Sequence, residues 1–365
     1  MAGIWADFPS GSQGLYGTSA AAMTDGAWSN VVTTRLSNDP DPSIGSTGKV
    51  LDIGWSGTNG YVRYALPSAQ ATVGIARRFF VAGLPTNRAG PRVFVWRNAG
   101  NGIIAYIYVT TTGGIGFVNS SSDSAAPTYE TAGPVITANS WWHIEAKLIC
   151  GTSSNATIEV RVNGVTKIVQ TGFSTSSATC SSVSMERGDY GSTIGGQSFC
   201  KDFVLWDGTG SQVNDFQGTV NVYYQPPTVD VTSGGWTLSS GTSISSLIGI
   251  VGPPVDTSYI AASSVLPVAA QIKLGALPAD ITSVRFVIPL VRAAKVDGGD
   301  GNIQISLTPD GVNFDNGPNT PVTTAFTYWG NSTAPFVSHL NPLTGTAWTP
   351  VDFATGVIMK INRTV

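Results

Sequence analysis

Charged residues are scarce in this sequence of 365 residues, because Asp, Glu, Lys and Arg together make up only 11% of it. An ordinary soluble domain has about 25%. Glutamate is especially rare, with four residues in the chain: Glu130, Glu145, Glu159 and Glu186. The shortage of Glu and Lys, both strong helix formers, excludes a coiled coil or a helix bundle. The net charge is −3, and without a basic stripe or polybasic run we expect no nucleic-acid partner and no membrane.

The sequence also contains few cysteines and no long apolar run. No apolar run reaches the roughly 18 residues that a membrane-spanning helix needs. The first eight residues lack the cationic and apolar regions of a secretory signal peptide, so we expect synthesis and folding in a cytoplasm. The three cysteines, Cys150, Cys180 and Cys200, include no Cys-x-x-Cys pair. Reduced, buried thiols are therefore expected, and a Cys180–Cys200 bridge stays an alternative.

Glycine, proline and apolar residues dominate instead. The chain has 43 Gly and 21 Pro, and 42% of its residues are hydrophobic. Apolar and polar residues alternate along 142–148 and 158–162, which predicts strands with one buried face and one solvated face. Asn163-Gly164 directly follows the second run and is a strong signal for a hairpin. We therefore predict an all-β protein built from antiparallel strands and tight turns.

The best domain boundary is the Pro- and Gly-containing segment 226–235, which we interpret as a linker between domains at 1–225 and 236–365. All four Glu and 13 of the 19 basic residues precede it. In the second part, the predicted strand Ser283–Arg292 is apolar on both faces. Such a strand lies inside a sandwich or faces another subunit, so Val287, Pro289 and Val291 are predicted to form an oligomer or docking surface.

Three segments of the first part resemble the concanavalin A-like lectin/glucanase jelly roll, in its laminin-G or pentraxin-like variant. They are Asn139–Glu145, Ile158–Gly164 and Lys201–Asp207. The resemblance implies a jelly-roll sandwich at 1–225, followed by a smaller antiparallel β-sandwich domain. The stretch from Asp202 to Val222 also looks like concanavalin-like domains of tailed-phage virion proteins. Two pieces of the second part, Asp256–Ile260 and Asn341–Pro350, resemble C-terminal β domains of such proteins.

Catalytic patterns are missing from the residues that such a fold would use. Glucanases of this fold need Glu-x-Asp-x-x-Glu, whose carboxylates stand about 5–5.5 Å apart in retaining enzymes. Glu145 and Glu159 alternate with apolar residues instead and are interpreted as solvated strand positions, and His143 lies on the same wet face. An inverting Asp pair or a Ser-His-Asp triad stays open. We predict that the chain is not an enzyme and has no catalytic residues.

Metal ligands are equally hard to find. Neither His143 nor His339 has a partner at metal-ligand spacing, so no metal site is predicted. The loops Asp297–Asn302 and Asn38–Pro42 carry oxygen ligands, but the first lacks the Glu of an EF-hand and both are interpreted as surface turns. A structural calcium ion stays an unsupported alternative, and no cofactor is expected.

Sugar binding is the functional alternative that the residues favour. Sugars present flat C–H patches and paired hydroxyls, which match aromatic rings and planar donors. Arg92 and Trp96 share a face if their strand alternates strictly, and Tyr106 and Tyr108 share a face of the next strand. These four residues are the candidate glycan platform, and the alternative is that their rings fill the space between two sheets.

Taken together with the resemblance, these patterns predict a structural protein of a phage virion: a head decoration, fibre, spike or tail appendage. We expect a homo-oligomer, with a trimer as the leading state, that contacts other virion proteins. Glycans of the host surface are a further candidate partner. The expected location is the virion, after folding in the host cytoplasm. The alternatives are a carbohydrate-binding adsorption protein and a glycan depolymerase.

Overall fold

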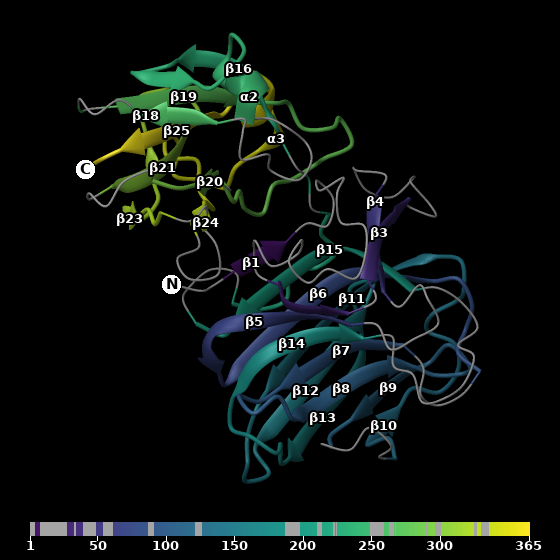
Figure 1. Ribbon diagram of the computed structural model, residues 1–365. Helices are drawn as coiled ribbons and strands as arrows, with labels where there is room; N and C mark the ends of the chain where they lie inside the picture. Colours follow the sequence, from purple (N-terminus) through teal and green to yellow (C-terminus); the bar gives the residue numbers. More distant parts are fainter. Residues whose placement is uncertain are drawn as a thin grey trace. The chain divides into compact units, whose positions relative to one another are not determined.

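A computed structural model gives the fold of the chain, which divides into two units, Met1–Tyr223 and Tyr224–Val365 (Figure 1). It describes residues 4–7, 28–32, 34–38, 49–53, 61–86, 91–120, 126–186, 198–209, 214–221, 223, 225–248, 259–262, 266, 268–289, 291–295, 301–324, 327–329 and 336–365. Most of the loops Asn38–Pro42 and Asp297–Asn302 lies outside these residues. Strands dominate both units, and all the strand pairs are antiparallel, so the predicted all-β class is confirmed.

The first unit is built from two antiparallel sheets. The eight-stranded sheet contains β13 (Val165–Phe173), β12 (Ala156–Val162), β11 (Trp141–Ile149), β6 (Thr72–Val81), β15 (Ser198–Asp207), β4 (Lys49–Ile53) and β3 (Thr34–Asn38) in that order, and β1 (Ile4–Asp7) pairs with β15. The seven-stranded sheet runs β10 (Tyr129–Glu130), β9 (Ile115–Val118), β8 (Ile103–Val109), β7 (Arg92–Arg97), β14 (Cys180–Glu186), β5 (Tyr61–Gln70) and β2 (Trp28–Val32).

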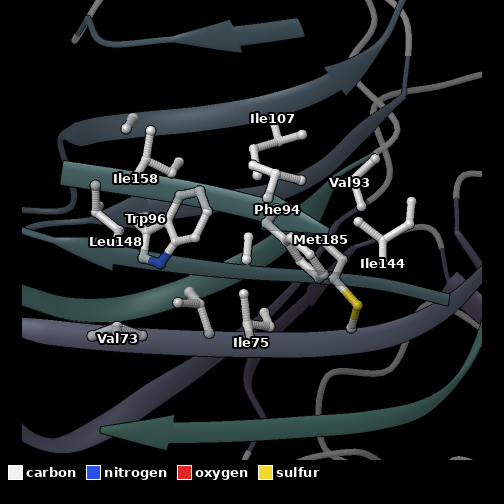
Figure 2. Packing of buried hydrophobic residues seen from close by; sticks show 14 of the residues in the cluster. Val73, Ile75, Val93, Phe94, Trp96, Ile107, Ile144, Leu148, Ile158 and Met185 are labelled. Carbon is white, nitrogen blue, oxygen red and sulfur yellow. The ribbon is translucent and has the colours of Figure 1, made fainter. Parts of the chain in front are cut away.

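The core of this unit lies between the two sheets. Val73 and Ile75 of β6 meet Phe94 and Trp96 of β7 there, each completely or almost completely buried (Figure 2). Alternate residues of the same strands point the other way, so each sheet also has an outer face. The structure therefore has the predicted sandwich, whose inner faces form the main hydrophobic cluster and whose outer faces carry polar groups together with two smaller apolar clusters.

Local features of the sequence produce the predicted turns. Asn163 and Gly164 have φ of 49° and 78°, the left-handed values that a two-residue hairpin needs, and they join β12 to β13. All three cysteines are free and buried, which agrees with the expected reduced thiols. Burial raises the pKa of Cys180 to about 12, with a smaller contribution from Cys150, and so keeps this thiol protonated.

The second unit is organised around one six-stranded sheet. Its order is β16 (Pro227–Thr232), β19 (Val268–Leu274), β25 (Ile358–Arg363), β21 (Asn302–Thr308) and β22 (Asp315–Asn316), with β23 (Thr320–Pro321) also paired to β21. Two short pairs and two short helices accompany it: β17 (Trp236–Leu238) with β18 (Ile260–Ala262), β20 (Val291–Ala293) with β24 (Thr327–Trp329), α2 (Ile244–Ile248) and α3 (Pro350–Thr355). Side chains such as Ile305, Trp348 and Phe353 form its separate core.

Two expectations for this unit need correction. The segment 226–235 is not a free linker, because most of it forms β16, which pairs with β19, and Asp230 accepts hydrogen bonds from the backbone of Ile244 and Ser245 at the start of α2. The segment 283–292 is not one strand, because Val287 makes only an isolated bridge to Ser338 before β20 begins.

The expected docking surface also differs in the structure. Val287 and Val291 pack against the core of their own unit, and Pro289 is buried. A run that is apolar on both faces here supplies intramolecular packing. The three side chains therefore do not form an exposed apolar surface within the unit.

Candidate functional site

The outer face of the seven-stranded sheet gathers arginine, tyrosine and glutamate side chains from four neighbouring strands. Arg92 on β7 lies opposite Tyr108 on β8 and opposite Glu186 on β14, and Glu186 lies opposite Tyr61 on β5. Strand register therefore aligns these four residues in one row across the sheet. Arg63, two residues after Tyr61, lies opposite Ser184 in the adjacent row. This arrangement brings groups 125 residues apart in the sequence to one place.

A β-bulge decides which side chains reach this face. The pairing of β7 with β8 shifts register between Arg92 and Phe94, so both Val93 and Phe94 contribute to the core and Arg92 points outward. Its guanidinium carbon lies 4.7 Å from the centroid of the Tyr106 ring. Without the bulge, strict alternation would have directed Arg92 into the space between the sheets.

Glu186 is the electrostatic centre of the face. Its Oε2 accepts a hydrogen bond from Nη1 of Arg92 at 3.0 Å, and its Oε1 accepts bonds from Nε of Arg97 at 3.2 Å and from the Ser184 hydroxyl at 2.6 Å. Burial and then the charge of Arg97 lower the pKa of Arg63, against smaller opposing effects of Tyr61 and Glu186. Two guanidiniums, those of Arg92 and Arg97, thus bind one carboxylate, and Arg63 lies close enough for its pKa to respond to both Arg97 and Glu186.

Tyrosine rings border the charged cluster. The rings of Tyr106 and Tyr108 have centroids 6.0 Å apart, and the Tyr108 hydroxyl donates a hydrogen bond to Glu130 on β10. The Tyr108 ring lies against Gly116, where an added Cβ would be only 2.2 Å from Tyr108 Cζ. On the other side of the cluster, the Arg63 guanidinium carbon is 5.3 Å from the centroid of the Tyr61 ring. Planar cations beside aromatic rings can bind a sugar ring and an anionic substituent on it.

The structure brings together three of the four residues of the predicted platform. Arg92, Tyr106 and Tyr108 are neighbours on the outer face, where all three are buried, whereas Trp96 lies between the sheets beside Phe94. The bulge explains the difference, because it places Arg92 and Trp96 on opposite faces of β7. Their role in glycan binding stays a prediction.

Four further members of the face were missed by the sequence patterns: Tyr61, Arg63, Arg97 and Glu186. The spacing of Tyr61 and Arg63, two residues apart, was a usable signal for a shared face of one strand. For Glu186 no such signal existed, because β14 was not among the predicted strands. Its central position between β7 and β5 depends on the sheet topology.

The outer face of the eight-stranded sheet is also polar, but the segment 214–221 lies on part of it. The Glu145 Oε1 atom accepts hydrogen bonds from the backbone N–H groups of Gln217 at 2.9 Å and Gly218 at 3.0 Å. Nε of Arg78 donates to Asn221 Oδ1 at 2.8 Å. Phe216 lies in the same segment, and the Arg161 guanidinium carbon is 3.7 Å from the centroid of its ring.

This covered face corrects the interpretation of His143 and Glu145 as solvated. Both point away from the core, as their alternation predicted, yet both have no exposed surface. Burial lowers the pKa of His143 to about 3, and the charge of Arg78 lowers it further. Among the residues that the structure describes, neither ring nitrogen has a hydrogen-bond partner. Burial raises the pKa of Glu145 to about 7 despite the two backbone hydrogen bonds. Glu159 remains partly exposed and accepts a bond from Arg161.

Among the described residues, no group of three or more His, Cys, Asp or Glu side chains is placed to hold a metal ion. In the same part of the chain, no helix is long and apolar enough to cross a membrane.

Comparisons with known proteins were made by family, by sequence and by structure. No protein-family model matches the chain, and no curated protein does. The alginate lyase vAL-1 from Chlorella virus matches with 11% identity and a TM-score of 0.38, over 51% of this chain and 94% of the lyase. The carbohydrate-binding module CBM66 from Bacillus subtilis matches with 10% identity and a TM-score of 0.34, over 50% of this chain and 96% of the module.

A sialidase matches with 13% identity and a TM-score of 0.34, over 53% of this chain but only 18% of the sialidase, so this chain spans a small part of that protein. Other matching structures include the alginate lyase Aly36B and an endo-β-1,4-glucuronan lyase from Trichoderma reesei. The structures named here are carbohydrate-active or carbohydrate-binding proteins.

The prediction that the chain is not an enzyme was wrong to exclude enzymes, because polysaccharide lyases are among the matching structures. The reasoning rested on the missing carboxylate pattern of glucanases. That pattern belongs to glycoside hydrolysis, and its absence says nothing about lyases.

Proposed function

We propose that the N-terminal unit binds a polysaccharide on the outer face of the seven-stranded sheet. The observation that carries this proposal is the row of Tyr108, Arg92, Glu186 and Tyr61 across four adjacent strands. Tyr61 is the partly exposed member of this row, and its ring provides flat apolar surface for the C–H face of a sugar. Tyr108, Arg92 and Glu186 are buried and hold the floor of the face in place. Tyr61 and Arg63 are partly exposed, so we place the entry to the site on β5.

A panel of polysaccharides tested by isothermal titration calorimetry examines this proposal. We expect at least one member to bind the wild-type protein and Tyr61→Ala to weaken that binding by about tenfold, because a stacking platform is removed. Tyr129→Ala is the matched control, since Tyr129 is an exposed tyrosine on β10 at the edge of the same sheet. Absence of binding across the panel, or equal losses in the two variants, would overturn the proposal.

The same incubations also distinguish binding from cleavage. Ultraviolet absorbance detects the unsaturated ends that a lyase leaves, and a reducing-sugar assay detects hydrolysis. Product formation that Tyr61→Ala abolishes would make the face an active site. Binding without product over a long incubation would make it a binding site.

We further propose that this unit is part of a phage virion, as a head decoration, fibre, spike or tail appendage. The support is the resemblance of the stretch Asp202–Val222 and of two pieces of the second unit to virion proteins. The partners would be further copies of this chain, as a trimer, and other virion proteins. Mass spectrometry of purified particles and light scattering of the isolated protein test these points. Absence of the chain from particles, or a monomer in solution, would refute the corresponding part.

A further inference from the structure

We propose that Cys150 and Cys180 form a disulfide between the two sheets of the sandwich in an oxidising environment. Cys150 directly follows β11 of the eight-stranded sheet, and Cys180 is the first residue of β14 in the seven-stranded sheet. Both thiols are free in the structure. The pair is thus a modification site, and its existence does not depend on polysaccharide binding.

The corner between β5 and β6 brings the two cysteines to one level of the sandwich. β5 ends at Gln70 in the seven-stranded sheet and β6 begins at Thr72 in the eight-stranded sheet, so Ala71 alone connects the sheets. Residues two apart are separated by at most about 7 Å, so the sheets approach more closely here than the usual spacing of about 10 Å. Cys180 lies opposite Gln70, and the N–H of Cys150 donates a hydrogen bond to the Ala71 carbonyl at 2.8 Å. Both cysteines therefore flank this corner, where the short separation suits a disulfide.

A second connection joins the end of β11 to the segment that leads into β14. The N–H of Gly151 donates to the Thr175 hydroxyl at 2.9 Å, and the N–H of Thr175 donates to the Gly151 carbonyl at 2.6 Å. Cys150 and Cys180 both belong to the core cluster between the sheets, with exposed fractions of 7% and 0%. Cys150 also contributes to the raised pKa of Cys180, an electrostatic effect that weakens with distance. Both thiols therefore face the same small space.

Cys200 lies too far away to compete for either partner. It is opposite Phe79 in the register of β15 with β6, whereas Cys180 lies at the other end of β6, near Thr72. The seven residues from Thr72 to Phe79 rise by about 23 Å. The Cys200 Sγ atom instead lies 3.8 Å from Sδ of Met185. The fold therefore disfavours the Cys180–Cys200 bridge that the sequence left open.

A glutathione disulfide is a suitable oxidant, because thiol–disulfide exchange conserves atoms and electrons. The thiolate of Cys150, the more exposed of the two, attacks one glutathione sulfur and releases the other glutathione as a thiol. The thiolate of Cys180 then attacks the Cys150 sulfur, so the sulfur–sulfur bond of the protein forms and the second glutathione leaves. Two protein thiols are oxidised, and one glutathione disulfide is reduced to two thiols. Burial raises the pKa of Cys150 to about 11, so the reaction should be faster at about pH 9 than at about pH 7.

The experiment oxidises the full chain in two ways. Folded protein is incubated with excess oxidised glutathione at about pH 9, and a second sample is refolded from urea in a glutathione redox buffer, where burial does not limit access to the thiols. Peptide mapping by mass spectrometry without reductant should find Cys150 linked to Cys180 and Cys200 as a thiol. A linkage found only after refolding would support the pairing and place its formation during folding. A linkage that involves Cys200, glutathione attached without closure, or free thiols in both samples would overturn the proposal.

Variants connect the linkage to stability. Cys150→Ala should abolish the linkage, and Cys200→Ala is the matched control that should retain it. The bond closes a loop of about 30 residues, so oxidation should raise the melting temperature of the wild type and of Cys200→Ala by about 5–10 °C. Cys150→Ala should show no such rise, and dithiothreitol should reverse the rise in the other two proteins. Melting of each reduced variant establishes that it is folded. No rise in the wild type, or an equal rise in Cys150→Ala, would contradict a cross-link that stabilises the sandwich.

Discussion

Replacement of Glu145 by glutamine should make the protein more stable in neutral and alkaline solution. Glu145 lies on the outer face of β11 with no exposed surface. Its Oε1 accepts two backbone hydrogen bonds from the segment 214–221, but its Oε2 has no hydrogen-bond partner in the described part of the chain. A buried carboxylate with one unpartnered oxygen is unfavourable when it is charged. Glutamine has nearly the same shape, keeps a carbonyl that accepts both bonds and carries no charge.

The magnitude follows from the pKa of the carboxyl group, which burial raises from 4.5 to about 7. One pKa unit corresponds to about 1.4 kcal/mol, so the charged form costs the fold on the order of 3 kcal/mol. A raised pKa means that the folded state binds the proton more tightly than the unfolded state does. This contribution to stability is therefore fully present below about pH 4.5 and is lost as the pH rises through about 7. An unpaired amide N–H₂ in the variant offsets about 1 kcal/mol, which leaves an expected gain of about 2 kcal/mol at pH 8.

Urea denaturation followed by tryptophan fluorescence, at pH 5 and at pH 8, measures both parts of this expectation. Glu145→Gln should gain stability at pH 8 and should differ little from the wild type at pH 5. Glu159→Gln is the control, since Glu159 is a partly exposed carboxylate on the neighbouring strand β12. An equal gain at both pH values, or no gain at pH 8, would refute the reasoning from the buried charge.

Three further perturbations test other parts of the first unit. Burial depresses the pKa of His143 from 6.5 to about 3, so the contribution of the neutral imidazole to stability is present above about pH 6.5 and is lost as the pH falls toward 3. His143→Gln should therefore shift acid unfolding, followed by circular dichroism, to lower pH. An unchanged midpoint would contradict this expectation. Arg77 is almost fully buried, and its guanidinium carbon lies 4.9 and 5.4 Å from the ring centroids of Phe79 and Phe94. In thermal melting, Arg77→Met should leave stability unchanged or raise it by about 1–4 kcal/mol. A large loss of stability would show that the fold needs the cation. Gly116→Ala forces the Tyr108 ring to move, so it should lower stability by about 1–3 kcal/mol and should also weaken polysaccharide binding. Unchanged binding would argue against a role for the Tyr108 ring.

Periodicity in the sequence was sufficient to predict the strands of the sandwich and the inner or outer orientation of many side chains. Along β11 and β12, apolar residues at every second position do face the core. The same alternation correctly put His143 and Glu145 on an outer face. It failed to predict their burial, because the covering segment 214–221 is about 70 residues away in the sequence and carries no periodic signal.

Departures from regular geometry limited the prediction of the candidate site. Strict alternation grouped Arg92 with Trp96, and a single bulge in β7 separated them. The pairing of Arg92 with Glu186 depends on β14 lying next to β7, although 94 residues separate the two side chains. Such pairings follow from the topology of the whole sheet. The prediction of a docking surface around Val287 differs from the structure for a related reason, because the apolar side chains of this segment pack against the core of their own unit.

The positions of β14 and β15 in the two sheets have a consequence for synthesis of the chain on the ribosome. β14 separates β5 from β7, and β15 separates β4 from β6, yet both strands come from residues 180–207. Until that segment has emerged, strands β6 and β7 each lack a central neighbour, and their apolar faces have no complete partner sheet to pack against. Nascent chains that end before residue 207 should therefore aggregate or bind chaperones, because such long-range pairings form late. A fragment meant to contain the sandwich must extend through β15 and the segment 214–221.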